Sequence, residues 1–184
     1  MLRVIIVGLG KQSYKHADAL VISGFELIGG VDPELGSRER FKDKYNCAVF
    51  SSIEKDDLEA LTNVNLAVIC TPIFARKGVI RTLVEHGIKT FVVEKPLAVT
   101  HNDLEFFDEL EKSSDVKFYV NYTYRMTPPF YQLKLCAISQ PHAFLYGRFH
   151  LGARGNHRVW KHRVGSGGGV YNELGVHMRD LANY

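Results

Sequence analysis

The sequence has no long hydrophobic run: its apolar stretches all fall short of the roughly 20 residues that a helix needs to cross a bilayer. Its first residues run directly into a predicted strand, without the pattern of a signal peptide. We therefore expect a soluble, cytoplasmic protein with no membrane partner. The 184 residues, 46% of them hydrophobic, can form one domain, or one domain and part of another, around a substantial core.

Cysteine is scarce, with only Cys47, Cys70 and Cys136 in the chain. Their number is odd, they lie far apart and no two have C-x-x-C spacing. This pattern excludes a disulfide framework and a cysteine-based metal site. We expect all three to be small core residues, and we expect no metal cofactor.

An excess of charge is also lacking, because the formal net charge is only +3. The basic residues Arg154, Arg158, Lys161 and Arg163 gather in one stretch that has no acidic residue. A DNA-binding protein would need a recognition helix or a larger basic field, so we expect no nucleic-acid partner. Two alternatives remain for the basic stretch: it binds a carboxylate or nucleotide-sugar phosphate of a substrate, or it is a solvated loop.

Short apolar runs rich in β-branched residues alternate with amphipathic stretches as far as about Asn121. The alternation is typical of a parallel sheet wrapped by helices, whose buried strands are apolar on both faces. We predict strands at residues 3–7, 26–31, 48–50, 66–70, 90–93 and 117–120. We predict helices at residues 11–22, 36–45, 53–61, 74–85 and 102–112, the last capped by Asn102.

After about Asn121 the pattern changes to a helix at 128–138, a strand at 143–151, a glycine- and arginine-rich loop and a helix beginning near Gly168. One strand and two helices are too few to close an independent domain, because a lone strand leaves its backbone groups unpaired. We therefore expect residues 122–184 to be an incomplete substrate or oligomerisation domain. The unpaired strand predicts a homo-oligomer.

A glycine-rich loop follows the first strand and opens the first helix, in the order Gly8-Leu9-Gly10-Lys11-Gln12-Ser13. Gly8 allows a tight turn, and Gly10 lets a pyrophosphate approach the backbone. The helix start, at Lys11, Gln12 and Ser13, offers N–H groups to the anion, and Ser13 is small enough for close packing. We interpret the loop as a dinucleotide site; the alternative is an ordinary glycine turn.

Asp32 follows the second predicted strand, where a carboxylate binds the adenine ribose hydroxyls and repels a 2′-phosphate. This position favours NAD over NADP, although Arg38 and Arg40 lie near enough in sequence to accept a phosphate. The glycine-rich loop, the second strand and Asp32, in this order along the chain, predict an α/β fold. We expect a Rossmann doubly wound parallel sheet over residues 1–121.

Two more strand ends belong to the same edge of the predicted sheet. Thr71 and Pro72 follow the fourth strand, and Glu94, Lys95 and Pro96 follow the fifth. Ligands of open α/β sheets bind beyond the carboxyl ends of the strands, so we expect these residues to line the cofactor crevice. The alternative for Lys95 is an ordinary surface lysine after a strand.

The segment GGGVYNELGVHMRD, residues 167–180, holds a second group of polar residues. On a helix, Glu173, His177 and Asp180 project from one face. A carboxylate one turn before an imidazole can fix its tautomer and leave the other nitrogen free to exchange a proton. The alternative is a helix-stabilising pair on a solvated face.

Together these motifs resemble the glucose-fructose oxidoreductase and inositol dehydrogenase family (Gfo/Idh/MocA). The resemblance spans nearly the whole chain and is most specific at the E-K-P and G-G-G to H-x-x-D motifs. The matching residues are GLGKQS at 8–13, Asp32, CTP at 70–72, EKPLA at 94–98, Arg125, and Glu173, Gly175, His177 and Asp180.

The resemblance implies a dinucleotide-binding Rossmann domain joined to an α/β substrate domain. It also implies that Lys95 is the active-site lysine, that the Lys95–Pro96 bond is cis, and that His177 transfers the proton. Glu173 would be the partner of His177 and a substrate contact, although the family more often has aspartate there. Arg76 stands where members often have histidine, and the family's proteins are much longer than this chain.

These observations give two hypotheses for function. In the first, the chain is an NAD(P)-dependent oxidoreductase that moves a hydride between nicotinamide and a secondary alcohol of a sugar, cyclitol or sugar derivative. His177 removes the hydroxyl proton, and Lys95 stabilises the oxyanion or relays the proton. In the second, the chain is a truncated or degenerate, non-catalytic dinucleotide-binding module of the same family.

Overall fold

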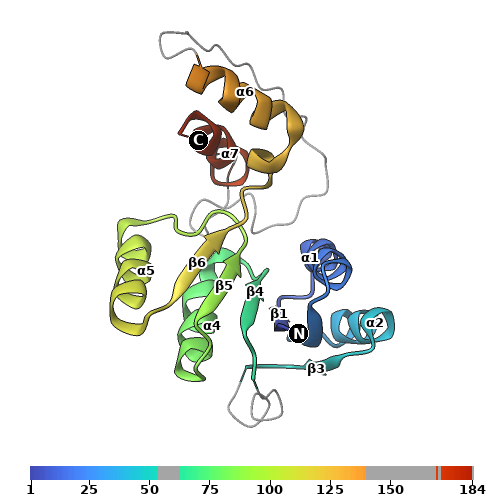
Figure 1. Cartoon of the computed structure of the whole chain (residues 1–184). Coiled ribbons are helices and arrows are strands. Elements are labelled where there is room, and N and C mark those ends of the chain that lie inside the picture. The colour runs from blue at the N-terminus through green and yellow to red at the C-terminus, as the bar shows by residue number, and fades with distance from the viewer. Residues whose placement is uncertain (54–62, 140–168, 170, 184) are drawn as a thin grey trace. The chain divides into compact units, whose positions relative to one another are not determined.

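The computed structural model describes residues 1–53, 63–139, 169 and 171–183 (Figure 1). The chain forms two compact units, Met1–Val120 and Asn121–Tyr184, and we describe each by itself. The predicted helix at 53–61 and the predicted strand at 143–151 fall almost wholly outside the described residues, as does the basic stretch between Arg154 and Arg163.

The first unit contains one six-stranded sheet, in the order β3-β2-β1-β4-β5-β6 with all neighbours parallel (Figure 1). This order confirms the doubly wound sheet, because the chain starts in the middle and builds outward in both directions. The predicted strand bounds are confirmed except at β4, which ends one residue earlier than expected. The strands are β1 (Arg3–Val7), β2 (Glu26–Val31), β3 (Ala48–Phe50), β4 (Leu66–Ile69), β5 (Thr90–Val93) and β6 (Lys117–Val120).

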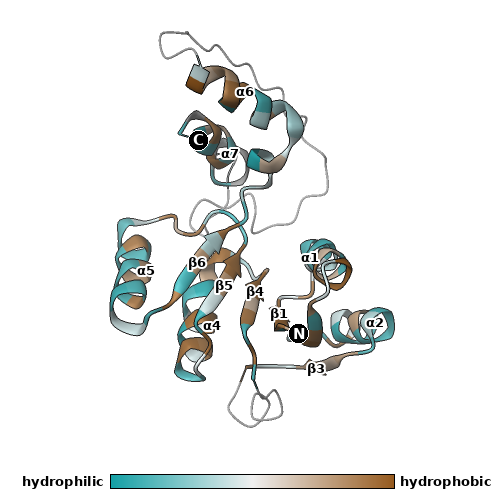
Figure 2. Ribbon diagram, in the orientation of Figure 1, coloured by the Kyte–Doolittle hydropathy of each residue, from teal (hydrophilic) through white to brown (hydrophobic). Residues whose placement is uncertain are grey.

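The helices cover both faces of the sheet, and alternate strand residues point to opposite faces. Ile5 and Phe91 pack with Ile80 of one pair of helices, whereas Ile6 packs with Ala17 of the other. The central strands are correspondingly hydrophobic in Figure 2. The helices are α1 (Lys11–Ile22) and α2 (Leu35–Tyr45) on one face, and α4 (Ile73–Glu85) and α5 (His101–Ser114) on the other.

The cap of α5 differs from the prediction. Asn102 lies inside the helix, and Thr100 is the N-cap. The Thr100 hydroxyl accepts the N–H of Asp103 at 3.1 Å, and the Asp103 carboxylate accepts the N–H of Thr100 at 3.1 Å. This reciprocal capping box satisfies two backbone donors at once, which a single cap at Asn102 would not do.

The described residues of the second unit contain two α-helices, one short 3-10 helix and one short π-helix. A helix was predicted from near Gly168; the structure begins it at Tyr171 with a π-helical segment before regular α-helix starts at Val176. No residue of α6 is buried among those the structure describes. No helix in the described residues is long and apolar enough to span a membrane. The elements are η1 (Thr123–Met126), α6 (Pro128–Ser139), η4 (Tyr171–Gly175) and α7 (Val176–Ala182).

Candidate active site

Gly8 directly follows β1 and lies against the residues that follow β4. Its φ is +90°, a conformation that L side chains rarely adopt. A Cβ atom there would lie 2.8 Å from the carbonyl carbon of Cys70 and 2.8 Å from the nitrogen of Thr71. The Gly8 N–H also donates to the Val31 carbonyl at 2.8 Å. Only glycine therefore fits the turn that leads from β1 into the loop.

Gly10 serves the loop in a different way. It is the N-cap of α1, its φ of −77° suits any residue, and no side chain caps the helix at this position. A Cβ added there would meet no atom within 4 Å, so the backbone faces open space. Ser13 is buried behind it and donates from its hydroxyl to the Gly10 carbonyl at 2.6 Å. Lys11 and Gln12 are exposed.

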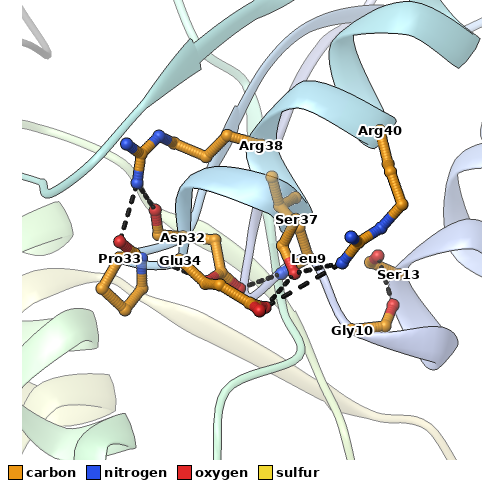
Figure 3. Close-up of polar contacts among 9 residues, drawn as sticks. All are labelled: Leu9, Gly10, Ser13, Asp32, Pro33, Glu34, Ser37, Arg38 and Arg40. Atoms are coloured by element: carbon orange, nitrogen blue, oxygen red, sulfur yellow. Dashed lines mark hydrogen bonds and ion pairs between the residues drawn. The ribbon is translucent and has the colours of Figure 1, made fainter.

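The Asp32 carboxylate holds this loop in place (Figure 3). One oxygen accepts the N–H of Leu9 at 2.7 Å, and the other accepts the N–H of Glu34 at 2.9 Å. A carboxylate has about four acceptor positions, so these two bonds leave capacity for hydroxyl donors. Asp32 thus connects the glycine loop to the β2–α2 turn.

The two arginines near Asp32 have different surroundings (Figure 3). Arg38 donates to the backbone carbonyls of Asp32 at 2.7 Å and Pro33 at 2.8 Å. Arg40 is mostly exposed, lies 4.0 Å from the Glu34 carboxylate and donates to the Ser37 hydroxyl at 3.1 Å. The charge of Arg40 is therefore partly offset by Glu34. We call Gly8–Ser13 together with Asp32 the glycine-loop edge.

A second edge is formed by the turns after β4 and β5, residues 70–72 and 94–96, which we call the β4–β5 edge. The Lys95–Pro96 peptide bond is cis, as predicted. Arg76, nearly completely buried on α4, donates to the Thr71 carbonyl at 3.0 Å and to the Pro96 carbonyl. The sequence marked Arg76 only as a departure from the family pattern; the structure places it as a bridge between the two turns.

Among the described residues, the Thr71 side chain has a hydroxyl group that is left without a hydrogen bond at this edge. Its Oγ1 is buried and makes no hydrogen bond within the part of the chain that the structure describes. Buried hydroxyls are nearly always hydrogen-bonded, so such an atom indicates a place for a ligand or water. Pro72 and Lys95 beside it are partly exposed.

His16 is a residue that the sequence reading missed. It lies on α1, and its Nε2 is 2.8 Å from Oε1 of Glu94, with only 15% and 11% of the two side chains exposed. Its spacing gave a signal, because His16 falls three residues after Ser13 and one before Ala17 on the buried side of the helix. A histidine on that face needs a polar partner.

The cysteines have no catalytic environment. Burial, reinforced by the negative charge of Glu94, raises the pKa of Cys70 well above its ordinary value, so its thiol stays protonated. Burial also raises the pKa of Cys47. The expectation that all three cysteines are core residues is wrong for Cys136, which is exposed on α6. No group of three metal-ligating side chains occurs in the described ranges.

In the second unit, Arg125 and Asp180, which both match the family motifs described above, come together. Arg125 binds the nearly buried Asp180 with two hydrogen bonds, one of 2.7 Å from Nε. His177 lies edge-on to Tyr124, with ring centroids 4.7 Å apart. His177 and Asp180 therefore share the face of α7 that contacts η1. The side chain of Glu173 lies outside the described residues.

Tyr122, next to this group, has a raised pKa. Burial is the main cause, and the negative charge of Asp180 adds to it while Arg125 opposes it. The phenol therefore remains protonated and can act only as a neutral hydrogen-bonding group near His177, whose ring centroid lies 6.1 Å away.

Solved structures with the same fold are much longer than this chain, which spans about half of most of them. An NAD-binding protein from Listeria innocua is 25% identical, with a TM-score of 0.84 over 98% of this chain and 53% of its own. The WlbA dehydrogenase from Thermus thermophilus, solved with NAD and UDP-GlcNAcA, is 23% identical, with a TM-score of 0.78 over 98% and 62%. GenD2 from gentamicin A biosynthesis, solved with NAD, is 20% identical, with a TM-score of 0.83 over 98% and 52%.

No curated protein matches the chain. A family model, described as an oxidoreductase family with an NAD-binding Rossmann fold (GFO_IDH_MocA), matches residues 2–122. These residues contain both the glycine-loop edge and the β4–β5 edge. The chain therefore belongs to the Gfo/Idh/MocA oxidoreductase family.

Proposed function

We propose that residues 1–121 form a domain that binds a nicotinamide dinucleotide, NAD in preference to NADP. The observation that carries this proposal is the glycine-loop edge itself, in which the Asp32 carboxylate holds a loop whose Gly10 backbone faces open space. The α1 N-terminus behind Gly10, at Lys11, Gln12 and Ser13, supplies N–H groups for the pyrophosphate. Thr71, whose buried hydroxyl makes no hydrogen bond in the described residues, would complete the crevice with Pro72 and the Glu94–Lys95 turn.

The preference for NAD follows from charge. Asp32 keeps acceptor capacity for the ribose hydroxyls, and its negative charge opposes a 2′-phosphate. Arg38 is engaged with two backbone carbonyls, and Arg40 lies beside Glu34. Arg38 is therefore held by backbone contacts, and the charge of Arg40 is partly offset, so both are less available to a 2′-phosphate than free arginines would be. A structural relative from Desulfitobacterium hafniense is assigned to NADPH by its name, so the preference needs a direct test.

We further propose that the protein acts in hydride transfer at a secondary alcohol of a sugar, cyclitol or sugar derivative. The bound nicotinamide would supply the hydride acceptor or donor. Lys95, presented by the turn after β5, would stabilise the developing oxyanion or relay its proton. His177 would exchange the hydroxyl proton, and Glu173 would fix the imidazole tautomer and contact substrate. The WlbA structures that contain UDP-GlcNAcA support a sugar derivative as substrate.

The second candidate is a non-catalytic dinucleotide-binding module. It is favoured by one observation: the chain spans only about half the length of the solved structures it matches. If residues 1–184 act by themselves, the substrate domain lacks part of its walls, and an open site loses the positioning and desolvation that hydride transfer requires. Pairing of two copies through residues 143–151 remains a prediction.

The proposal is tested by fluorescence titration with NADH and NADPH. We expect the wild-type chain to bind NADH at least about tenfold more tightly, a difference of about 1.4 kcal/mol. Asp32→Asn keeps an acceptor for Leu9 but removes the charge, so it should reduce the preference mainly by improving NADPH binding. Asp18→Asn, at an exposed position on α1, is the matched control and should change neither affinity.

Failure of the wild-type chain to bind either coenzyme would contradict both candidates. If NADH binds, turnover with sugars and cyclitols separates them. Replacing Lys95 by Ala should abolish turnover and leave NADH affinity nearly unchanged if the chain is an enzyme. Absence of turnover in the wild-type chain, with NADH bound, would favour the non-catalytic module.

A further inference from the structure

The most informative contact outside the expected site joins His16 to Glu94. The two residues are 78 positions apart in sequence, yet Nε2 and Oε1 are 2.8 Å apart. Both side chains are largely shielded from water. A shielded carboxylate without a partner would be costly, so this contact fixes the position of the Glu94 side chain.

The geometry of the sheet explains why they meet. Phe91 and Val93 point into the core under α4 and α5, whereas Val92 packs on the side of α1 and α2. Because side chains alternate along an extended chain, Glu94 points to the same side as Val92. His16 occupies the inner face of α1 on that side, so the contact is a direct consequence of strand and helix periodicity.

The same turn is held from the other face of the sheet by Arg76. Its guanidinium, on α4, donates to the carbonyls of Pro96 and Thr71. Burial raises the pKa of the neighbouring Cys70 thiol, and the charge of Glu94 raises it further while that of Arg76 lowers it. The residues on either side of Lys95 are thus fixed by side chains from two helices on opposite faces.

We propose that His16 is a positioning residue. It holds Glu94 from α1, while Arg76 holds the same turn from the other face of the sheet. Together these contacts make the turn present Lys95 in one defined orientation. The glycine loop leads into α1, so this helix connects the proposed coenzyme-binding site to the turn that carries Lys95. The placement of Lys95 is a property of the folded chain alone. Its link to coenzyme rests on the proposed function, and we expect loss of the His16 contact to weaken NADH binding about tenfold through that helix.

The test follows Lys95 directly by NMR. The lysines of the whole chain are reductively methylated with ¹³C-formaldehyde, and the Lys95 signal is assigned as the one missing from Lys95→Arg. We expect His16→Leu, which fills similar space but has no hydrogen-bond donor, to displace this signal. His16→Gln retains an N–H donor and should return the signal towards its wild-type position. His86→Leu, at an exposed histidine at the other end of α4, is the control and should leave it unchanged.

The outcomes separate positioning from simple packing. An unmoved Lys95 signal in folded His16→Leu, or equal displacement in His16→Gln and His16→Leu, overturns the proposal. If His16→Leu does not fold, Glu94→Ala tests the same contact from the other side, and an unmoved signal there overturns it equally. If NADH binds neither the wild-type chain nor any variant, the proposed function fails. The comparison of the Lys95 NMR signal in the coenzyme-free protein still decides the role of His16.

Discussion

The glycine-loop edge and the β4–β5 edge lie at the same end of one sheet, but different interactions hold them. The glycine-loop edge depends on atoms that are absent: Gly8 has no Cβ to strike Thr71, and Gly10 leaves its backbone open. The β4–β5 edge depends on large buried side chains, Arg76 and Glu94, each bound to a partner from another element. The first edge leaves backbone accessible, as the proposed coenzyme site requires, and the second is fixed by hydrogen bonds of buried side chains.

This difference predicts two kinds of sensitivity. Adding atoms should damage the glycine-loop edge, because a close approach of two strands or a ligand needs the space. Removing atoms should damage the β4–β5 edge, because each lost polar side chain leaves its buried hydrogen-bonding partners unsatisfied. The predictions below test the distinction with substitutions at matched positions.

The largest effect is expected from Gly8→Ala. The new Cβ would have to occupy a φ of +90° and lie 2.8 Å from two backbone atoms. Strain and overpacking together should lower the free energy of unfolding by roughly 2–5 kcal/mol. Urea denaturation of the wild-type and Gly8→Ala chains measures this difference, and coenzyme binding should be lost with the loop geometry.

Gly10→Ala is the matched variant, because its Cβ would meet no protein atom within 4 Å. We expect it to change the free energy of unfolding by less than about 1 kcal/mol and yet to weaken NADH binding. Equal destabilisation by the two substitutions would show that Gly8 is not special to the packing. Unchanged NADH binding in Gly10→Ala would place the pyrophosphate elsewhere.

At the β4–β5 edge, Arg76→Met should lower the free energy of unfolding by about 2–3 kcal/mol. Methionine fills much of the volume but cannot donate to the Thr71 and Pro96 carbonyls. Arg76→Lys should fall between, because an ammonium keeps the charge but has no planar fork to span both carbonyls. Thermal or urea unfolding of the three chains gives the order.

Arg81→Met is the control on the same helix. Arg81 is exposed and lies over the Phe106 ring, 5.2 Å from its centroid, so its loss should cost no more than about 1 kcal/mol. A similar cost for Arg76→Met and Arg81→Met would mean that the buried guanidinium does not hold the two turns, and the contrast between the edges would disappear.

The comparison also explains how much the sequence alone could predict. The motif of the glycine-loop edge is local: Gly8, Gly10 and Ser13 directly follow one strand, so a short segment shows their residue types and spacing. Strand bounds were equally predictable, because buried parallel strands are continuous apolar runs. Of the six strands predicted for residues 1–121, all but the fourth have the bounds that the structure gives.

The partners at the β4–β5 edge could not be predicted, because they come from distant parts of the chain. His16 meets Glu94 across 78 residues, and Arg76 meets Pro96 across 20. No local pattern specifies such pairs; the sheet order brings them together. The prediction of the α5 cap was wrong for a smaller reason. Asn102 is a suitable cap by residue type, but Thr100 and Asp103 form a reciprocal capping box.

A smaller loss of stability than for Gly8→Ala or Arg76→Met is expected just beyond the β4–β5 edge, at Asp103. Burial alone would raise the pKa of this carboxyl, but hydrogen bonds from Lys77, Thr100 and Val99 outweigh it and hold the pKa below its ordinary value. A lowered pKa means that the folded state binds the proton less tightly, so the stabilisation is complete above about pH 4 and is lost as pH falls further. Asp103→Ala should lower the free energy of unfolding by about 1–2 kcal/mol at pH 7, and much less near pH 3. Urea denaturation at both pH values measures the change, with the exposed Asp108→Ala on the same helix as control. A loss of equal size at pH 7 and pH 3 would show that the stabilisation does not depend on the charge of the Asp103 carboxylate.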